Sequence, residues 1–357
     1  MRALAGIVLA LALASPATAA TVARTTPEAG PVLAGSEVMW GSAGTDGSVR
    51  VMAGAPGGPP RLVHRVAAPT GRRTTRVIGP LAASHAAFAV RVQTATFATI
   101  NSESYRVEPG LLGGPLSGSP NLLFGSIPEQ VDDRSCEGGY EELADFDVDG
   151  ARFAVGMESG PCAAIGESLQ SRFSIVLHDG GSRRVVEAGS GLGPLAVALA
   201  GRFLAWRGER ELVVHDLESG TTDARIRNSN VGGGWISDFD LQADGSVVLV
   251  GRCAREPCGV RLFARIPSRP GVLLLDRRVT GPLALAGGRV LYERRVGRGY
   301  GRTALVAQPV AGGPARIHAR LGARRDLVGH PDLDETHATW AVGPVAGGRG
   351  RIVVRSL

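Results

Sequence analysis

Residues 201–220 read Gly-Arg-Phe-Leu-Ala-Trp-Arg-Gly-Glu-Arg-Glu-Leu-Val-Val-His-Asp-Leu-Glu-Ser-Gly. A glycine turn leads into a short apolar segment that ends at Trp206, and a second turn leads into another apolar segment, residues 211–217. The turn at residues 218–220 is followed by residues 222–226, which favour a further strand. Short apolar runs separated by turn residues indicate antiparallel β-strands.

The same pattern of turn and strand recurs along the chain. Its turn position falls on Gly35, His85, Gly150, Gly201, Gly245, Gly287 and Glu335. The steps between these positions are 50, 65, 51, 44, 42 and 48 residues, close to the length of one four-stranded propeller blade. Small apolar residues before each turn suit the crowded innermost strand of a blade; these segments are 31–34, 80–83, 145–148, 194–197, 238–241, 282–286 and 331–333.

Seven copies predict an all-β fold: a seven-bladed β-propeller of four-stranded antiparallel blades that spans residues 20–357 as a single domain. Six or eight blades are alternatives that the spacing leaves open. Another alternative is a row of β-sandwich domains, but sandwiches need strands of unequal role and long crossovers. A single pattern at nearly constant spacing therefore favours the propeller.

The layout resembles the exported TolB-like and WD-repeat-type propellers. Residues 213–217, Val-Val-His-Asp-Leu, followed by Gly220, match a strand of those blades, and Ala243-Asp244-Gly245 matches the turn before another. The Ser-Pro-Asp-Gly signature of the TolB-like blade is reduced here to Asp-Gly or Gly, and no Trp-Asp dipeptide closes a blade. The resemblance implies the architecture and transfers no binding residue.

The two ends of the repeat array predict how the ring closes. The last segment, residues 351–357, corresponds to a third strand, and no sequence remains for a fourth. A missing outer strand would leave an exposed sheet edge. Residues 21–25 precede the first blade and have strand character. We expect this N-terminal strand to complete the last blade.

The first 19 residues have the features of a secretory signal peptide. Arg2 is followed by an apolar run over residues 4–14 and by the small-residue site Ala17-Thr18-Ala19, which predicts cleavage after Ala19. A membrane anchor is the alternative, but the run is too short and ends at Ser15-Pro16. No later segment contains the run of about 18 apolar residues that a membrane-spanning helix needs. We therefore expect a secreted, periplasmic or cell-surface protein.

The charge pattern argues against a nucleic-acid partner. The net charge is +6, and all 39 basic residues are arginine. They are dispersed, and aromatic residues make up only 5% of the chain, whereas nucleic-acid surfaces combine clustered basic residues with aromatic ones. The predicted partner is a protein, peptide or glycan, and the chain is expected to be a monomer.

Four cysteines, Cys136, Cys162, Cys253 and Cys258, predict disulfides in an exported chain. Cys253 and Cys258 flank a short turn within one repeat, and the other two bracket the inner strands of the third repeat. Pairing within each blade is expected because the two pairs belong to non-adjacent blades. A zinc site is the alternative, but the ligand spacing does not match.

Carboxylates mark the candidate binding site. Asp145, Asp238 and Asp332 recur near the start of inner strands, where a propeller brings residues to the mouth of its central channel. There they would bind a cation or a polar ligand. The alternative, which we favour, is that they accept hydrogen bonds from backbone amides of neighbouring blades.

Asp145, Asp147 and Asp149, followed by Gly150, also match the first half of a calcium-binding loop. Position 12 of such a loop falls on Gly156, where a glutamate is needed. The repeat explains Asp149-Gly150 as a hairpin turn equivalent to Asp244-Gly245. The turn is therefore favoured over a calcium site, and no cofactor is predicted.

The sequence contains no catalytic motif that we can identify. Its seven histidines are scattered over different repeats, and no Gly-x-Ser-x-Gly elbow occurs. The glycines of residues 189–193 precede a predicted strand and not a helix, so they predict a turn and not a phosphate loop. The 65-residue step between the second and third copies contains residues 110–120 and 131–136, which predict a binding loop or a tolerated insertion.

The leading hypothesis is an exported, non-catalytic binding or scaffold propeller. The rival is a propeller enzyme, such as a lyase, a glycosidase or a quinoprotein, whose residues gather at the channel mouth from several blades. Three or more carboxylates or histidines at one mouth would favour the enzyme, and a mouth of alanine, glycine and backbone would favour the scaffold.

Overall fold

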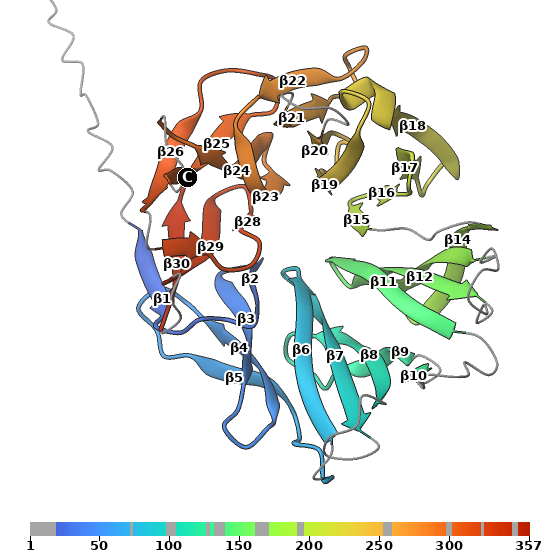
Figure 1. The fold of residues 1–357 in the computed structure, drawn as a ribbon, viewed down its shortest axis with the longest axis vertical. Coiled ribbons are helices and arrows are strands. Elements are labelled where there is room, and N and C mark those ends of the chain that lie inside the picture. Colours follow the sequence, from blue (N-terminus) through green and yellow to red (C-terminus); the bar gives the residue numbers. More distant parts are fainter. Residues whose placement is uncertain are drawn as a thin grey trace, which may run out of the picture.

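The chain forms a ring of seven four-stranded blades around a central channel (Figure 1). The computed structural model describes residues 19–71, 74–97, 105–125, 129–131, 140–160, 171–190, 196–252, 259–297, 302–322, 325–344 and 349–357. Every strand pair in it is antiparallel, and the described part contains no α-helix. The predicted fold class and blade number are confirmed.

The strands run outward from the channel in each blade. Blade 1 contains β2 (Ala29–Ala34), β3 (Glu37–Ala43), β4 (Val49–Gly54) and β5 (Arg61–Val66). Blade 2 contains β6 (Thr74–Ala83), β7 (Ala87–Phe97), β8 (Tyr105–Pro115), β9 (Asn121–Gly125) and β10 (Glu129–Val131). Blade 3 contains β11 (Tyr140–Asp149), β12 (Arg152–Gly160), β13 (Arg172–Asp179) and β14 (Ser182–Ser190). Blade 4 contains β15 (Ala196–Ala200), β16 (Phe203–Arg207), β17 (Glu211–Asp216) and β18 (Thr221–Arg227), followed by a 3-10 turn, η1 (Asn228–Val231).

The remaining three blades have the same layout. Blade 5 contains β19 (Trp235–Leu241), β20 (Val247–Arg252), β21 (Val260–Arg265) and β22 (Leu273–Asp276). Blade 6 contains β23 (Val279–Ala286), β24 (Arg289–Arg295), β25 (Thr303–Pro309) and β26 (Arg316–Leu321). Blade 7 contains an inner strand in two pieces, β27 (Arg325–Leu327) and β28 (Asp332–Leu333), then β29 (His337–Pro344), β30 (Arg351–Ser356) and β1 (Ala20–Ala23).

The repeated turn joins the first and second strands of each blade. Gly201 shows why glycine recurs there: its φ is +54°, a left-handed conformation that side chains disfavour. A Cβ at Gly201 would also lie 2.9 Å from the Cβ of Ala243 in the next blade. The turns of neighbouring blades therefore approach closely, and this approach spaces the blades around the ring.

Apolar packing between blades supplies the core. The buried apolar residues of the described chain form seven clusters, one between each pair of neighbouring blades. Tyr292, fully buried between blades 5 and 6, also places its hydroxyl 2.8 Å from Asp276 Oδ2 and 2.9 Å from Gln308 Oε1. Each blade therefore depends on both of its neighbours for the burial of its faces.

The ring closes in blade 7, as the sequence predicts. Strand β1 pairs with β30, with Ala20 opposite Val354 and Thr21 opposite Val353. Val22 is buried in the cluster that joins blades 7 and 1. The N-terminal strand thus covers the outer edge of the C-terminal strand.

Blade 2 departs from the predicted layout. Residues 110–115, which we expected in a loop, form the end of strand β8. Close contacts leave no room for a side chain at Gly113 and Gly114 of this strand. A Cβ at Gly113 would lie 2.3 Å from Leu123 Cδ1, and one at Gly114 would lie 2.8 Å from Pro120 Cα. The long step, from position 85 to position 150, arises partly from the length of β7, β8 and β11 and from the extra strand β10.

Some predictions concern residues outside the described part of the chain. They are residues 1–18 of the predicted signal peptide, the four cysteines Cys136, Cys162, Cys253 and Cys258, and residues 132–136. Among the described residues, no helix has the length and apolar character needed to cross a membrane.

Candidate functional site

One mouth of the central channel forms a cavity of about 550 Å³. Its wall is built from the inner strands of all seven blades and from the segments that lead into those of blades 1 and 7. Its charged or titratable residues are Glu28, Asp145, Asp147, Asp238, Asp240, His330 and Asp332. The structure thus brings the predicted Asp145, Asp238 and Asp332 to a single cavity. We call it the mouth cavity.

The aspartates of the mouth cavity accept hydrogen bonds from the backbone of the following blade. Asp147 Oδ2 accepts from Leu199 N at 2.7 Å, and Asp240 Oδ2 accepts from Leu285 N at 2.6 Å. Asp332 Oδ2 accepts from Leu33 N at 2.6 Å, across the seam where the ring closes. Three further acceptors extend this pattern: Asp145 to Val197 N (2.9 Å), Asp149 to Gly201 N (2.9 Å) and Asp238 to Leu283 N (3.2 Å).

These bonds give acceptors to backbone amides that would otherwise be unpaired. The innermost strand of each blade is an edge strand, so its amides on the channel side have no strand partner. A buried amide without an acceptor costs about 1–3 kcal/mol. Aspartates at alternate positions of β11 and β19 reach the amides of β15 and β23, because alternate residues of a strand point to the same side. The aspartates thus accept hydrogen bonds from backbone amides of neighbouring blades, as expected from the sequence.

Burial raises the pKa of these carboxyl groups. The pKa is raised to about 6 for Asp145 and Asp332 and to about 7 for Asp147, since desolvation disfavours the charged form more than the amide hydrogen bonds favour it. The pKa of Asp240 is raised well above its usual value by burial and by the charges of Asp147 and Asp332. The aspartates of blades 3, 5 and 7 therefore lie close enough to repel one another.

The outer level of the mouth cavity combines acidic and basic groups. Burial raises the pKa of Asp238, which the charges of His330 and Arg207 oppose; the same two groups oppose the rise at Asp145. Arg207 itself donates to Ile236 O at 2.6 Å. Asp145, with its pKa raised to about 6, can therefore exchange a proton near neutral pH.

The predicted calcium ligands are arranged along a strand. Asp145, Asp147 and Asp149 occupy alternate positions of β11, so the first and last lie roughly 13 Å apart along the backbone. Calcium needs oxygen atoms at about 2.3–2.6 Å from one point. The described residues include no group of three or more histidine, cysteine, aspartate or glutamate side chains placed to hold a metal ion.

The sequence interpretation missed three residues of the mouth cavity: Glu28, Asp240 and His330. Two of them have a detectable signal. Asp145-Phe-Asp147, Asp238-Phe-Asp240 and His330-Pro-Asp332 occupy the same register, so Asp240 and His330 could have been read from the alternation. Glu28 precedes the first repeat and has no such signal.

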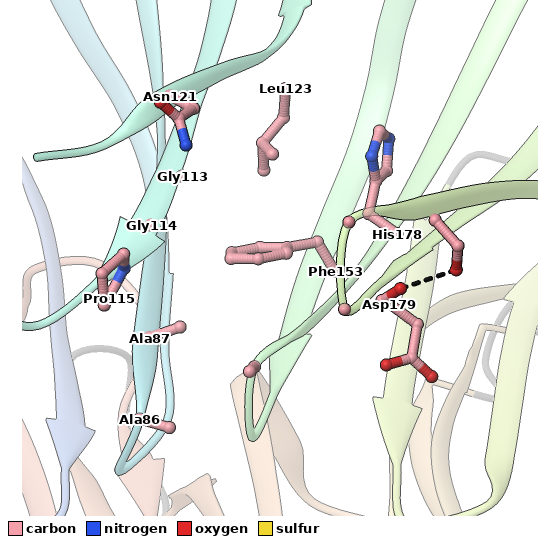
Figure 2. Close-up of a pocket in the computed structure, with 14 residues that line it drawn as sticks. Ala86, Ala87, Gly113, Gly114, Pro115, Asn121, Leu123, Phe153, His178 and Asp179 are labelled. Atoms are coloured by element: carbon pink, nitrogen blue, oxygen red, sulfur yellow. Dashed lines mark hydrogen bonds between the residues drawn. The ribbon is translucent and has the colours of Figure 1, made fainter. Parts of the chain in front are cut away.

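A second cavity, of about 260 Å³, lies between blades 2 and 3 (Figure 2). We call it the blade 2–3 cleft. Blade 2 contributes Ala86, Ala87, Gly113, Gly114, Pro115, Asn121 and Leu123, and blade 3 contributes Ala151, Phe153, His178, Asp179, Gly180, Gly181 and Ser182. The cleft lies between two blades at the repeated turns, which contribute Ala86 and Ala151, whereas the mouth cavity is lined by the inner strands of all seven blades.

Comparisons with known proteins establish the fold. No family model matches the chain, and no curated protein matches it. The β-propeller domain of the Trilobed protease from Pyrococcus furiosus is 11% identical, with a TM-score of 0.54 and coverage of 93% of this chain and 95% of that one. An oligogalacturonate lyase in complex with manganese is 11% identical, with a TM-score of 0.54 and coverage of 96% and 97%.

The predicted resemblance to TolB is also found among solved structures. TolB from Acinetobacter baumannii is 12% identical, with a TM-score of 0.38 and coverage of 79% of this chain and 80% of that one. The seven blades and the two likenesses with a TM-score of 0.54 show that the protein is a β-propeller, a fold shared by binding proteins and enzymes alike.

Proposed function

We propose that this chain is an exported binding propeller whose mouth cavity takes a cationic group, such as an arginine or lysine side chain of a protein or peptide partner. The observation that carries the proposal is the gathering of five aspartates from three blades, Asp145, Asp147, Asp238, Asp240 and Asp332, on the wall of one cavity. The cavity volume, about 550 Å³, lies in the range of ligand sites.

The aspartates keep binding capacity beyond their structural hydrogen bonds. An ionised carboxylate offers about four acceptor positions. Asp238 uses two of them, for Leu283 N and Phe239 N. The remaining lone pairs are available to a donor that enters the cavity, and a guanidinium or ammonium group supplies several donors. A cation would also relieve the repulsion among the carboxylates. Although the chain carries a net charge of +6, this cavity favours a positive ligand.

Binding is expected to depend on pH. Cation binding favours the ionised carboxylates, and the pKa values of Asp145 and Asp147 are raised to about 6 and about 7. A cationic ligand should therefore displace protons, and its affinity should increase as the pH rises from 5 to 8.

Calorimetry with short peptides tests the proposal. Ac-Gly-Arg-Gly-NH2 should bind at least about tenfold more tightly than Ac-Gly-Glu-Gly-NH2, with proton release that depends on the buffer. The double variant Asp145→Asn, Asp238→Asn should lose this preference. Asp46→Asn, in an exposed turn of blade 1, is the matched control and should keep it. Equal binding of the two peptides, or an unchanged preference in the double variant, would refute the proposal.

A second candidate is an enzyme with its site at the same mouth. The convergence of five aspartates and His330 favours it, and carboxyl groups with pKa values near 6 to 7 are suited to general acid–base catalysis. The oligogalacturonate lyase covers nearly the whole chain at the level of the fold. Release of unsaturated products from oligogalacturonate, lost in Asp145→Asn, would support the enzyme; no turnover of uronate or neutral oligosaccharides would leave the binding function.

A further inference from the structure

The blade 2–3 cleft exists because blade 2 presents unusually small side chains to its neighbour. In each blade, one residue of the second strand pairs with one of the third, and the pair faces the following blade. The seven equivalent pairs are Met39–Ala53, Ala89–Gly113, Ala154–Leu177, Ala205–Val214, Val248–Ala264, Leu291–Ala307 and Thr339–Val354. Ala89–Gly113 is the smallest of them, and the cleft lies beside it.

The floor of the cleft is apolar. Phe153 of blade 3 projects toward blade 2, and Leu123 of the outer strand lies above its ring (Figure 2). Gly113 permits this approach, because a Cβ there would lie 2.3 Å from Leu123 Cδ1 and 3.0 Å from Phe153 Cε1. Ala87, only 3% exposed, completes the floor. The cleft therefore has apolar surfaces on both of its walls.

Two neutral polar groups lie on the rim. Asn121 of blade 2 directs its amide toward the cleft, and the imidazole of His178 stands on the opposite wall (Figure 2). Burial, together with the charge of Arg183, lowers the pKa of His178, so its imidazole is neutral at neutral pH and both donates and accepts. The Asp179 carboxylate points away from Phe153 (Figure 2). Its backbone oxygen instead accepts from Ser182 Oγ at 2.6 Å.

The dimensions of the cleft limit the size of its ligand. An apolar protein cavity of about 150 Å³ accommodates benzene, so about 260 Å³ accommodates a substituted six-membered ring or an indole. Neither Asn121 nor His178 carries a charge that could pair with a charged substituent, and Arg183 does not line the cleft. A hydroxyl or ring N–H would find a partner there.

We propose that the blade 2–3 cleft binds a neutral aromatic ring that carries a hydrogen-bonding substituent, as in the side chains of tyrosine and tryptophan. The ring packs against Leu123 and Phe153, which line the cleft together, and its substituent bonds to Asn121 or His178. The source of the ring is either a free aromatic compound or a side chain of an extended peptide. This site is separate from the mouth cavity, so it stands or falls independently of the function proposed above.

Calorimetric titration with side-chain analogues tests the chemistry. p-Cresol and 3-methylindole should bind saturably, whereas toluene, which lacks the polar group, and p-toluate, which is charged, should bind at least about fivefold more weakly. The ¹⁵N resonances of His178, one of seven histidines, should shift during the titration. Absence of saturable binding, or a His178 signal that does not respond, would overturn the proposal.

Variants of neighbouring leucines locate the site. Leu123→Ala enlarges the cleft and should shift the preference toward 3-methylindole by about tenfold. Leu122→Ala is the matched control, because Leu122 is 64% exposed on the same strand and does not line the cleft. Ala87→Leu fills the cleft and should abolish binding while the thermal midpoint shows that the variant is folded. Equal effects of Leu122→Ala and Leu123→Ala would overturn the assignment.

A peptide arm distinguishes the two sources of the ring. If Ac-Gly-Tyr-Gly-NH2 binds more tightly than p-cresol and this gain disappears in Leu123→Ala, the ring belongs to a peptide partner. The opposite outcome is that the peptide binds more weakly than p-cresol, while the binding of p-cresol still changes in Leu123→Ala. In that case the cleft takes a free aromatic compound. Binding of the peptide with no dependence on Leu123 would refute the site.

Discussion

Replacing Asp147 with alanine should destabilise the propeller strongly at pH 5 and only weakly at pH 8. Asp147 accepts two backbone hydrogen bonds, from Leu199 N at 2.7 Å and from Val148 N at 2.8 Å. Alanine leaves both amides without this acceptor, at about 1–3 kcal/mol each. Because channel water reaches this position, we expect a loss of about 2–4 kcal/mol when the carboxyl group is protonated.

The charge of Asp147 acts in the opposite direction at higher pH. Burial raises its pKa from 3.8 to about 7 in the folded protein. A raised folded-state pKa means that the folded chain binds more protons than the unfolded chain, so its stabilising contribution is complete below about pH 4 and is lost as the pH rises through 7. Between pH 5 and the folded-state pKa of about 7 lie two pKa units, which correspond to about 2.7 kcal/mol. We reduce this to about 1.5–2.5 kcal/mol because Asp147 lines an open cavity.

Thermal unfolding of wild type and Asp147→Ala at pH 5 and pH 8 measures this difference. With about 2.1 cal/mol/K of unfolding entropy per residue, a 357-residue chain has roughly 0.7 kcal/mol/K, so the effect of the substitution should change by about 2–4 °C between the two pH values. The comparison between the variant and wild type cancels the titration of groups that both share.

Asp46→Ala is the control for this experiment. The pKa of Asp46 is lowered to about 2, chiefly by its hydrogen bonds with Ser48, so the group stays ionised at both pH values and its substitution should have the same effect at each. If Asp147→Ala is equally destabilising at pH 5 and pH 8, or more so at pH 8, Asp147 is ionised throughout and the reasoning about its burial is wrong.

Three further perturbations test other parts of the structure. Deletion of residues 20–26 removes β1 and spares β2 (Ala29–Ala34), so it should lower the thermal midpoint by more than 5 °C and promote aggregation through the uncovered edge of β30; an unchanged midpoint would show that the seam contributes no stability. Tyr292→Phe removes a hydroxyl that bonds to Asp276 and should cost about 1–3 kcal/mol in urea unfolding, whereas Trp235→Phe, at a side chain that is 50% exposed, should cost little. Burial and three nearby arginines lower the pKa of His318 to about 4, so its contribution to stability is complete above about pH 6.5 and is lost as the pH falls toward 4; His318→Gln should reduce the slope of midpoint against pH in this window, and an unchanged slope would contradict the shift.

The fold could be predicted because its signals are local and repeated. Gly201 and the glycines at four equivalent turn positions adopt the left-handed conformation that glycine favours, and the continuous apolar run of Leu212 to Val214 marks a buried strand. Seven copies turn weak signals into a consistent spacing. The closing strand β1 was predicted by a different argument, from the outer strand that the C-terminal repeat lacked.

The site could be predicted only in part, since it depends on relations between blades. Asp145 and Asp238 carry a signal in the sequence, and the same alternation contains Asp240 and His330. The structure adds that Asp147, Asp240 and Asp332 bond to the inner strands of blades 4, 6 and 1. The blade 2–3 cleft has no motif at all. It arises from the small size of Ala89 and Gly113 relative to six equivalent pairs, and residues 110–115 suggested a loop where a strand forms.

The hydrogen bonds of the aspartates explain why blade 2 differs from the others. Blades 3, 5 and 7 carry aspartates on their inner strands and bond to blades 4, 6 and 1, respectively. The inner strands of blades 1, 2 and 6 instead contain Pro31, Pro80 and Pro282, and proline has no amide to satisfy. Blades with and without these aspartates cannot alternate strictly around a ring of seven. Because three blades carry them and four do not, two blades without aspartates must be neighbours.

That mismatch falls between blades 1 and 2. No aspartate of blade 1 bonds to β6 among the described residues, and the seam relies on apolar contacts such as Ile78 against Gly41, where a Cβ would lie 2.4 Å from Ile78 Cδ1. The described part of the seam between blades 2 and 3 also has no carboxylate–amide bond between inner strands. Blade 2 is therefore held on both sides by packing and by isolated polar contacts such as Ser84 Oγ to Gly150 O, at 2.6 Å. No carboxylate–amide bond between inner strands fixes blade 2 against its described neighbours. Its strands could therefore lengthen and its face could open into a cleft without breaking the bonds between the other blades.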